Sequence, residues 1–174
     1  VREMIETADI AFINQEVPMA GEGYAIRYYP MFNAPQDLGR DLVELGFDVI
    51  NIASNHMLDT GAAGLEATID FWESLDTLMI GGYKNEEDFD NIRVIEKNGI
   101  KLALLNYTDS TNGNYIPKDK PYIVNTVNKE KISKDLKIAE ENADFTIVFM
   151  HWGTEYRLSQ DKGQEELAQF MCEN

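Results

Sequence analysis

The chain has 174 residues, 44% of them hydrophobic, which is enough for one α/β domain with a continuous core over residues 1–174. Its 15 Lys and Arg are outnumbered by 31 Asp and Glu, and the formal charge of −16 opposes nonspecific binding to nucleic acid or to an anionic membrane. Cys172 is the only cysteine, which excludes an internal disulfide and a cysteine-based zinc cluster.

The first elements are a strand, a long loop and a helix. The apolar run 8–14 (ADIAFIN) predicts a strand, and a loop rich in Gly, Pro, Tyr and Asn follows over 16–34. Pro35 stands where the first turn of a helix tolerates proline, and Gly46 closes that helix. One face of the helix is marked by Leu38, Leu42 and Leu45.

The next unit again pairs a strand with a helix. Residues 47–53 (FDVINIA) form a nearly continuous apolar run, as expected of a strand covered on both faces, and the run leads into SNHMLDTG at 54–61. After Gly61, helical spacing is shown by Leu65, Ile69 and Trp72. TLMI at 77–80 predicts another short strand. This alternation favours βα units around a mainly parallel or mixed sheet.

The second half begins with a hairpin. Asn98-Gly99 lies between two β-rich arms in 92–107, which is a strong hairpin signal. The polar stretch 109–128 predicts a long loop that is functional or mobile. A helix is then indicated by Ile132, Leu136 and Ala139. DFTIVFM at 144–150 is the last strong strand, and it leads directly into HWGTEY at 151–156.

Both ends of the chain fall inside helical patterns. Val1 begins in one without a methionine, and the run 163–174 stops while another helix is still running. We therefore expect a truncation at both ends, with parts of the native protein outside these residues. No apolar stretch approaches the length of a membrane span, and no signal-peptide pattern opens the chain.

The only two histidines, His56 and His151, both follow a predicted buried strand, at the edge of an α/β sheet where ligands bind. Each could instead be a hydrogen-bonded residue that closes the sheet. Another strand end supplies Asn14 and Glu16, and Asn55 adds an amide oxygen. This mixed nitrogen and oxygen set suits zinc, manganese or iron. Glu16 alone could equally be a loop carboxylate in water.

Other polar and aromatic residues stand near the histidines. Asp59 lies three residues beyond His56 and could accept its ring N–H, or it could cap the next helix. Trp152 and Tyr156 could hold a substrate or belong to the core. Glu155 could be an acid, a base or a solvated charge. A serine nucleophile is not supported, because Ser54 lacks the glycines of a nucleophile elbow.

Three motifs in order resemble the bacterial capsule-synthesis CapA family, also called the poly-γ-glutamate synthesis domain. They are N-x-E at 14–16, SNHMLDTG at 54–61 and HWGTEY at 151–156, and GIKLALLNYT at 99–108 matches the strand between the two histidine motifs. The family is itself similar to calcineurin-like metallophosphoesterases. The resemblance covers nearly the whole chain and implies a metallophosphoesterase-like αββα sandwich with mixed sheets.

The resemblance also assigns roles position by position. Asn55 and His151 match metal ligands, and His56 matches a catalytic or phosphate-contacting histidine, which Asp59 would orient. Glu16 falls where the superfamily carries a metal-bridging acid, with Asn14 as a further candidate ligand, although the family's N-L-E is N-Q-E here.

Two family motifs are missing from the chain. They are an opening strand that ends in Gly-Asp and a closing Gly-His-His-Pro-His. The resemblance therefore implies that a divalent metal (Mn, Zn or Fe) binds weakly or not at all to these residues alone.

The resemblance implies a capsule or poly-γ-glutamate biosynthesis protein with a metal-dependent, phosphoesterase-type hydrolase site. The alternative is a non-catalytic component that binds, exports or assembles the polymer, and a third reading is a degenerate structural domain. Expected partners are an anionic polymer or phosphate-containing substrate and other capsule-synthesis membrane proteins, but not nucleic acid. A homodimer is a further alternative, because an unpaired sheet edge could pair with a second copy of the chain. The expected location is the bacterial cell surface, with an anchor outside this chain.

Overall fold

The computed structural model describes residues 1–174, which form helices and two three-stranded sheets. The α-helices are Arg2–Glu6 (α1), Gln36–Glu44 (α2), Gly61–Glu73 (α3), Glu86–Asp90 (α4), Lys129–Asn142 (α5) and Lys162–Glu173 (α6). A short 3-10 helix, Pro121–Ile123 (η1), interrupts the predicted long loop.

The first sheet consists of Phe12–Asn14 (β1), Val49–Asn51 (β2) and Leu78–Ile80 (β3), in the order β1-β2-β3 and all parallel. The crossovers that join them are α2 and α3, as the predicted βα units require. Both helices pack on the same face of this sheet, because the core between them contains Leu42 of α2 together with Leu65 and Trp72 of α3. The predicted helical face of α3 is confirmed.

The second sheet consists of Arg93–Lys97 (β4), Ile100–Thr108 (β5) and Phe145–His151 (β6). β4 and β5 are antiparallel, and β5 and β6 are parallel, so the sheet is mixed. Asn98 and Gly99 both have positive φ, at 54° and 80°, as the two central residues of a tight hairpin turn do. The predicted hairpin is confirmed.

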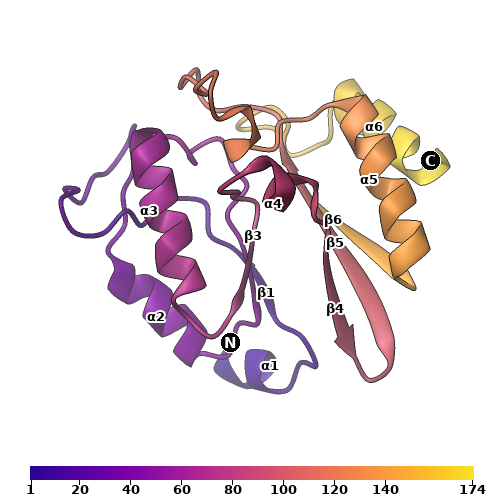
Figure 1. Ribbon diagram of the computed structural model, residues 1–174, viewed down its shortest axis with the longest axis horizontal. Coiled ribbons are helices and arrows are strands. Elements are labelled where there is room, and N and C mark those ends of the chain that lie inside the picture. Colours follow the sequence, from indigo (N-terminus) through magenta and orange to yellow (C-terminus); the bar gives the residue numbers. More distant parts are fainter.

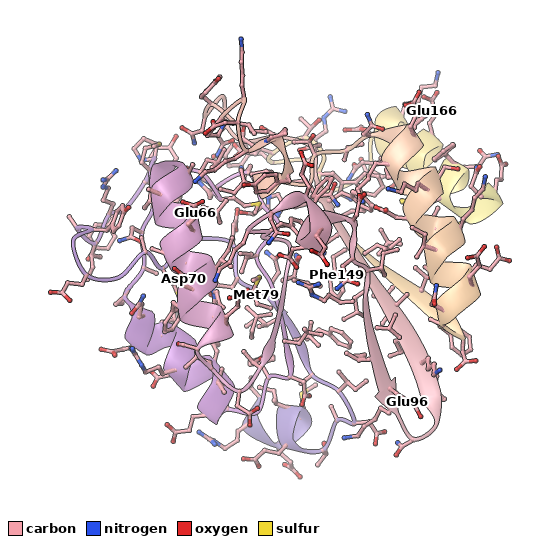
Figure 2. The ribbon with its side chains drawn as sticks, viewed as in Figure 1. Glu66, Asp70, Met79, Glu96, Phe149 and Glu166 are labelled. Carbon is pink, nitrogen blue, oxygen red and sulfur yellow. The ribbon has the colours of Figure 1, made fainter.

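The layers follow the order helix, sheet, sheet, helix, with α2 and α3 outside one sheet and α5 and α6 outside the other (Figure 1). Between the sheets lie the buried side chains of Val49, Ile80 and Leu104. Phe12 of β1 and Phe149 of β6 meet there with ring centroids 5.6 Å apart, and Figure 2 shows Phe149 between the layers. The expected αββα sandwich is confirmed, with one parallel sheet and one mixed sheet.

Several expectations about individual elements were wrong in detail. β1 covers only the end of the run 8–14, and Pro35 is the N-cap of α2 rather than a residue of its first turn. Leu38 was placed on the inner face of α2 but is 42% exposed, because Leu42 takes the core position. α4 had no clear sequence signal, since its run of acidic residues lacks an apolar face.

β6 differs from the prediction in its burial. It is an edge strand with β5 as its one neighbour, so its side chains are half-buried and Phe145 is exposed. His151 is the last residue of β6 rather than a residue beyond it. His56 lies further from its strand than expected, in a turn over 54–60 that follows β2. No helix in the structure combines the length and apolar character needed to cross a membrane.

Candidate functional site

The ends of β1, β2 and β6 bring Glu16, Asn55 and His151 to one cavity of about 460 Å³. Glu16 and Asn55 come from the first sheet and His151 from the second, so the cavity lies where the two sheets meet. The remaining lining residues come from the loops after β5 and β6: Asp109, Ser110, Asn112, Trp152, Gly153, Thr154, Glu155, Tyr156 and Arg157.

Glu16 and His151 face each other across the boundary between the sheets. Glu16 Oε1 lies 3.7 Å from His151 Nε2, and both side chains retain solvent access. A carboxylate and an imidazole at this spacing can form an ion pair when the histidine is protonated, or can turn toward a shared cation. The proximity of these two predicted ligands is thus present in the structure, while their metal role stays a prediction.

His56 is held by Asp59. His56 Nδ1 lies 2.7 Å from Asp59 Oδ2, and Asp59 also accepts the backbone N–H of Phe32 at 2.7 Å. The Phe32 ring packs edge-on against the imidazole, with centroids 4.8 Å apart. Of the two roles considered for Asp59, the contact with His56 is present and the helix cap is not, since α3 has Thr60 as its N-cap without a side-chain cap bond. His56 Nε2 makes no hydrogen bond within the protein, but His56 is not among the residues that line the cavity, and its catalytic role stays a prediction.

Ser54 has a structural position beside His56. Its side chain is fully buried, and Oγ donates to the Glu16 carbonyl oxygen at 2.6 Å and accepts the His56 backbone N–H at 3.1 Å. The hydroxyl therefore ties the end of β1 to the turn that carries His56. Because its hydrogen is engaged by a backbone carbonyl, Ser54 is not placed as a nucleophile, in line with the sequence analysis.

Asn55 presents an unpartnered acceptor. Its Nδ2 donates to Asn112 Oδ1 at 3.1 Å, but its Oδ1 is buried and has no hydrogen-bond partner. Buried polar atoms in native proteins are nearly always paired, so such an atom calls for an explanation such as a ligand or ion. Asn112 was not singled out from the sequence.

These donors fit a divalent metal in part. One carboxylate, one imidazole and one orphaned amide oxygen form the mixed nitrogen and oxygen set that zinc, manganese or iron accepts. However, no group of three or more His, Cys, Asp or Glu side chains is arranged to hold a metal. Glu16, Asn55 and His151 are therefore candidate ligands only, and their metal role stays a prediction.

Of the remaining predicted residues, some line the cavity and one does not. Asn14 does not line the cavity, because its Oδ1 accepts a hydrogen bond from Asn51 Nδ2 at 2.7 Å. Trp152 lines the cavity and also packs on the core beneath α5 and α6, so its core position is present while its substrate role stays a prediction. Glu155 and Tyr156 lie on the rim and are exposed, and Tyr156 has φ of 62°, which is uncommon for a bulky residue. Their substrate role stays a prediction.

The loop after β5 contributes contacts to the site that were not predicted from the sequence. Asp109 Oδ2 accepts the Gly153 N–H at 2.9 Å and so joins that loop to the one after β6. Asn112 and Asn114 contact Asn55 and Asp59 respectively. The polar run after β5 predicted a loop at this strand end, but it did not single out contacts such as that of Asn112 with Asn55.

A family model described as bacterial capsule synthesis protein PGA_cap matches residues 1–174. The chain is 33% identical over 146 residues to the capsule biosynthesis protein CapA of Bacillus anthracis, covering 81% of this chain and 35% of that protein. It is 28% identical over 133 residues to the PGA biosynthesis protein CapA of Bacillus subtilis (strain 168), covering 76% and 35%. The chain spans about a third of the length of these relatives.

A solved structure resembles the fold. It is a Staphylococcus aureus protein described as a 5'-nucleotidase, crystallised in complex with α-ketoglutarate. The TM-score is 0.57 at 14% sequence identity, and the match covers 97% of this chain and 36% of that chain. At this identity the likeness concerns the fold alone, and it agrees with the metallophosphoesterase-like sandwich inferred from the sequence.

Proposed function

The chain belongs to the bacterial capsule synthesis protein family PGA_cap, and from this premise we propose that its strand-end cavity is a divalent-metal-dependent hydrolase site used in capsule production. The substrate is phosphate- or amide-linked. The observation that carries the proposal is the convergence of Glu16, Asn55 and His151 from two sheets on one cavity, beside the His56–Asp59 pair.

His56 is the proton-transfer group in this proposal. Because Asp59 accepts the Nδ1 hydrogen at 2.7 Å, the tautomer is fixed and Nε2 is the nitrogen that exchanges a proton with the substrate. A protonated His56 donates from Nε2 to a leaving-group oxygen or nitrogen. The Phe32 ring, packed edge-on at 4.8 Å, keeps the imidazole plane in place.

Glu16, Asn55 and His151 are the residues that would hold the metal. A divalent cation, when bound, supplies Lewis-acid chemistry that polarises a phosphoryl or carbonyl oxygen. Asn55 contributes the amide oxygen that otherwise has no partner. Trp152 and Tyr156 on the cavity wall offer aromatic faces to the substrate, and Arg157 offers a cation to an anionic group.

Hydrolysis assays test the proposal. In the presence of Mn²⁺, the chain is expected to hydrolyse bis(4-nitrophenyl) phosphate, and His56→Gln is expected to lower kcat by about a hundredfold or more. Glu96→Gln, on exposed β4, serves as the control and should retain the wild-type rate. The absence of turnover with Mn²⁺, Zn²⁺ and Fe²⁺ on phosphodiesters and on γ-glutamyl amides would contradict a hydrolase function.

A second function, polymer binding without turnover, is favoured by the charge of the cavity. Glu16, Asp109 and Glu155 line it, and the whole chain carries a charge of −16, so an anionic polymer would be repelled unless cations bridge the two. Poly-γ-glutamate is then expected to bind only with a divalent cation and less tightly as salt rises. Equal binding with and without metal would exclude this form of the alternative.

The cellular setting extends the proposal. The relatives named CapA are capsule and PGA biosynthesis proteins. We place this protein at the bacterial cell surface, beside other membrane proteins of capsule synthesis, with a homodimer as one arrangement. Nucleic acid is not a partner in this proposal, because the net charge of −16 opposes phosphate-backbone contacts.

A further inference from the structure

Residues 109–114 follow β5 of the second sheet and fold over the site residues of the first. The segment is closed by its own hydrogen bonds, from Asn114 N–H to the Thr111 carbonyl (2.9 Å) and from Asn112 N–H to Ser110 Oγ (3.0 Å). Asn112 and Gly113 have φ of 53° and 76°, the conformation of the central pair of a tight turn. The turn therefore holds its own shape.

Two side chains of this turn reach the other sheet. Asn112 Oδ1 accepts from Asn55 Nδ2 at 3.1 Å, and Asn114 Nδ2 donates to Asp59 Oδ1 at 3.2 Å. Asn112 Nδ2 also lies 3.4 Å from His56 Nδ1, a nitrogen whose hydrogen is already directed to Asp59. The turn thus contacts the ligand candidate, the histidine and the carboxylate that orients it.

The bond to Asn112 determines how the Asn55 amide is oriented. A carboxamide is planar, with its donor nitrogen and acceptor oxygen on opposite sides, so fixing Nδ2 also fixes the direction of Oδ1. That oxygen is buried and has no partner in the protein. An oriented oxygen without a partner is available to bind a cation or to accept a hydrogen bond from a ligand.

We propose that Asn112 is a positioning residue that holds the Asn55 amide so that Oδ1 faces the bound ligand. Its side chain does not itself contact the ligand in this role. The identity of the ligand as a divalent cation rests on the proposed function, whereas the anchoring of Asn55 by Asn112 is a property of the protein alone.

The anchoring is tested by NMR on the metal-free chain, through hydrogen exchange of the Asn55 side-chain NH₂ with water. Asn112→Gly keeps the positive φ and removes the acceptor, so this exchange should accelerate by about tenfold or more. Asn112→Asp keeps an acceptor oxygen and should restore slow exchange. The matched control is Asn98→Gly, which has φ of 54° and loses one side-chain bond to Asp9 at the distant hairpin.

The consequence for the site is tested by titrating Mn²⁺ into the same variants. Affinity should fall by about tenfold in Asn112→Gly and stay at the wild-type value in Asn98→Gly. Unchanged Asn55 exchange in Asn112→Gly, or Mn²⁺ binding as tight as in the wild type, would overturn the positioning role. If the wild-type chain binds no Mn²⁺, the proposed metal site fails, and the exchange measurement still decides whether Asn112 anchors Asn55.

Discussion

At the scale of single residues, Asp59 is the group on which the His56 side of the site depends. It is 2% exposed, and its carboxylate accepts hydrogen bonds from Phe32 N–H, His56 Nδ1 and Asn114 Nδ2. One buried acceptor therefore joins a loop of the first half, the histidine turn and the turn after β5. This residue should affect both stability and activity.

Asp59→Ala is expected to lower the free energy of unfolding by about 2–4 kcal/mol, because it leaves buried donors without an acceptor. Asp37→Ala is the control, since the Asp37 side chain is 89% exposed and its pair with Arg40 lies in solvent; a change within about 0.5 kcal/mol is expected there. Urea unfolding measures both. Equal losses in the two variants would mean that the carboxylate network does not stabilise the fold.

The burial of the Tyr83 hydroxyl predicts a loss of folding stability at high pH. Its hydroxyl is buried and donates to Asn106 Oδ1 at 3.0 Å, and burial raises the pKa of this phenol to about 12. The unfolded chain loses the same proton near pH 10, so stability is complete below that pH and falls as the pH rises toward 12. The expected slope from Tyr83 is about 1.4 kcal/mol per pH unit.

Tyr83→Phe should therefore flatten the fall in unfolding free energy between these pH values. Tyr156→Phe is the matched control, because that ring is 98% exposed, and it should keep the wild-type slope. Chemical denaturation at a series of alkaline pH values gives both slopes. If the two variants behave alike, burial of Tyr83 is not the cause of the alkaline loss.

At the scale of elements, two glycines in the connections that follow strands differ in how closely they are packed. Gly81 follows β3 with φ of +98°, and a Cβ there would lie 2.5 Å from the Ala53 backbone nitrogen. Gly99 in the hairpin has a similar φ of +80°, but a Cβ there would meet nothing within 4 Å. Comparing substitutions at the two glycines therefore separates the cost of a positive φ from the cost of a steric contact.

Gly99→Ala is expected to cost about 1–2 kcal/mol, the penalty of a left-handed conformation for a residue with a Cβ. Gly81→Ala should cost more, about 3 kcal/mol or above, since the segments after β2 and β3 must also move apart. Thermal unfolding of the two variants compares them directly. Equal costs would show that the structure accommodates a Cβ at position 81 beside Ala53 with no additional loss of stability.

The sequence predicted those elements whose signal is local. Asn and Gly adopt positive φ more readily than other residues, and Leu65, Ile69 and Trp72 repeat at helical spacing, so the hairpin and α3 were predictable. The long polar stretch after β5 could be recognised only as a loop. Its folding over Asn55 depends on the packing of one sheet against the other, which no local pattern encodes.

The candidate site, too, could be predicted only where its contacts are local in the sequence. His56 and Asp59 are three residues apart, so their contact was one of the two roles that the sequence allowed for Asp59, the other being a helix cap. Glu16 and His151 were grouped only by the general rule that strand ends meet, and their 3.7 Å approach requires both sheets to be in place. Asn112 had no comparable rule and was found only in three dimensions.

At the scale of the whole molecule, the charge of −16 is the dominant electrostatic feature. Figure 2 labels acidic side chains on three separate elements: Glu66 and Asp70 on α3, Glu96 on β4 and Glu166 on α6. Because acidic residues outnumber basic ones by 31 to 15, repulsion within the folded chain should exceed the gain from its ion pairs.

Moderate NaCl is accordingly expected to raise the Tm, because screening weakens the repulsion between exposed carboxylates. Differential scanning calorimetry at low and moderate ionic strength measures the change, with sucrose as a control for effects that do not involve charge. A Tm that falls as salt is added would indicate that the ion pairs outweigh the repulsion.

The central claim is that residues from the two sheets jointly hold a divalent cation. Calorimetric titration of the chain with Mn²⁺ tests it most directly, with Glu16→Gln from the first sheet, His151→Gln from the second and Glu96→Gln as the control. We predict one weakly bound cation per chain, with affinity lower by about tenfold or more in each site variant and unchanged in the control. No Mn²⁺ binding, or binding that is indifferent to both Glu16 and His151, would contradict the claim.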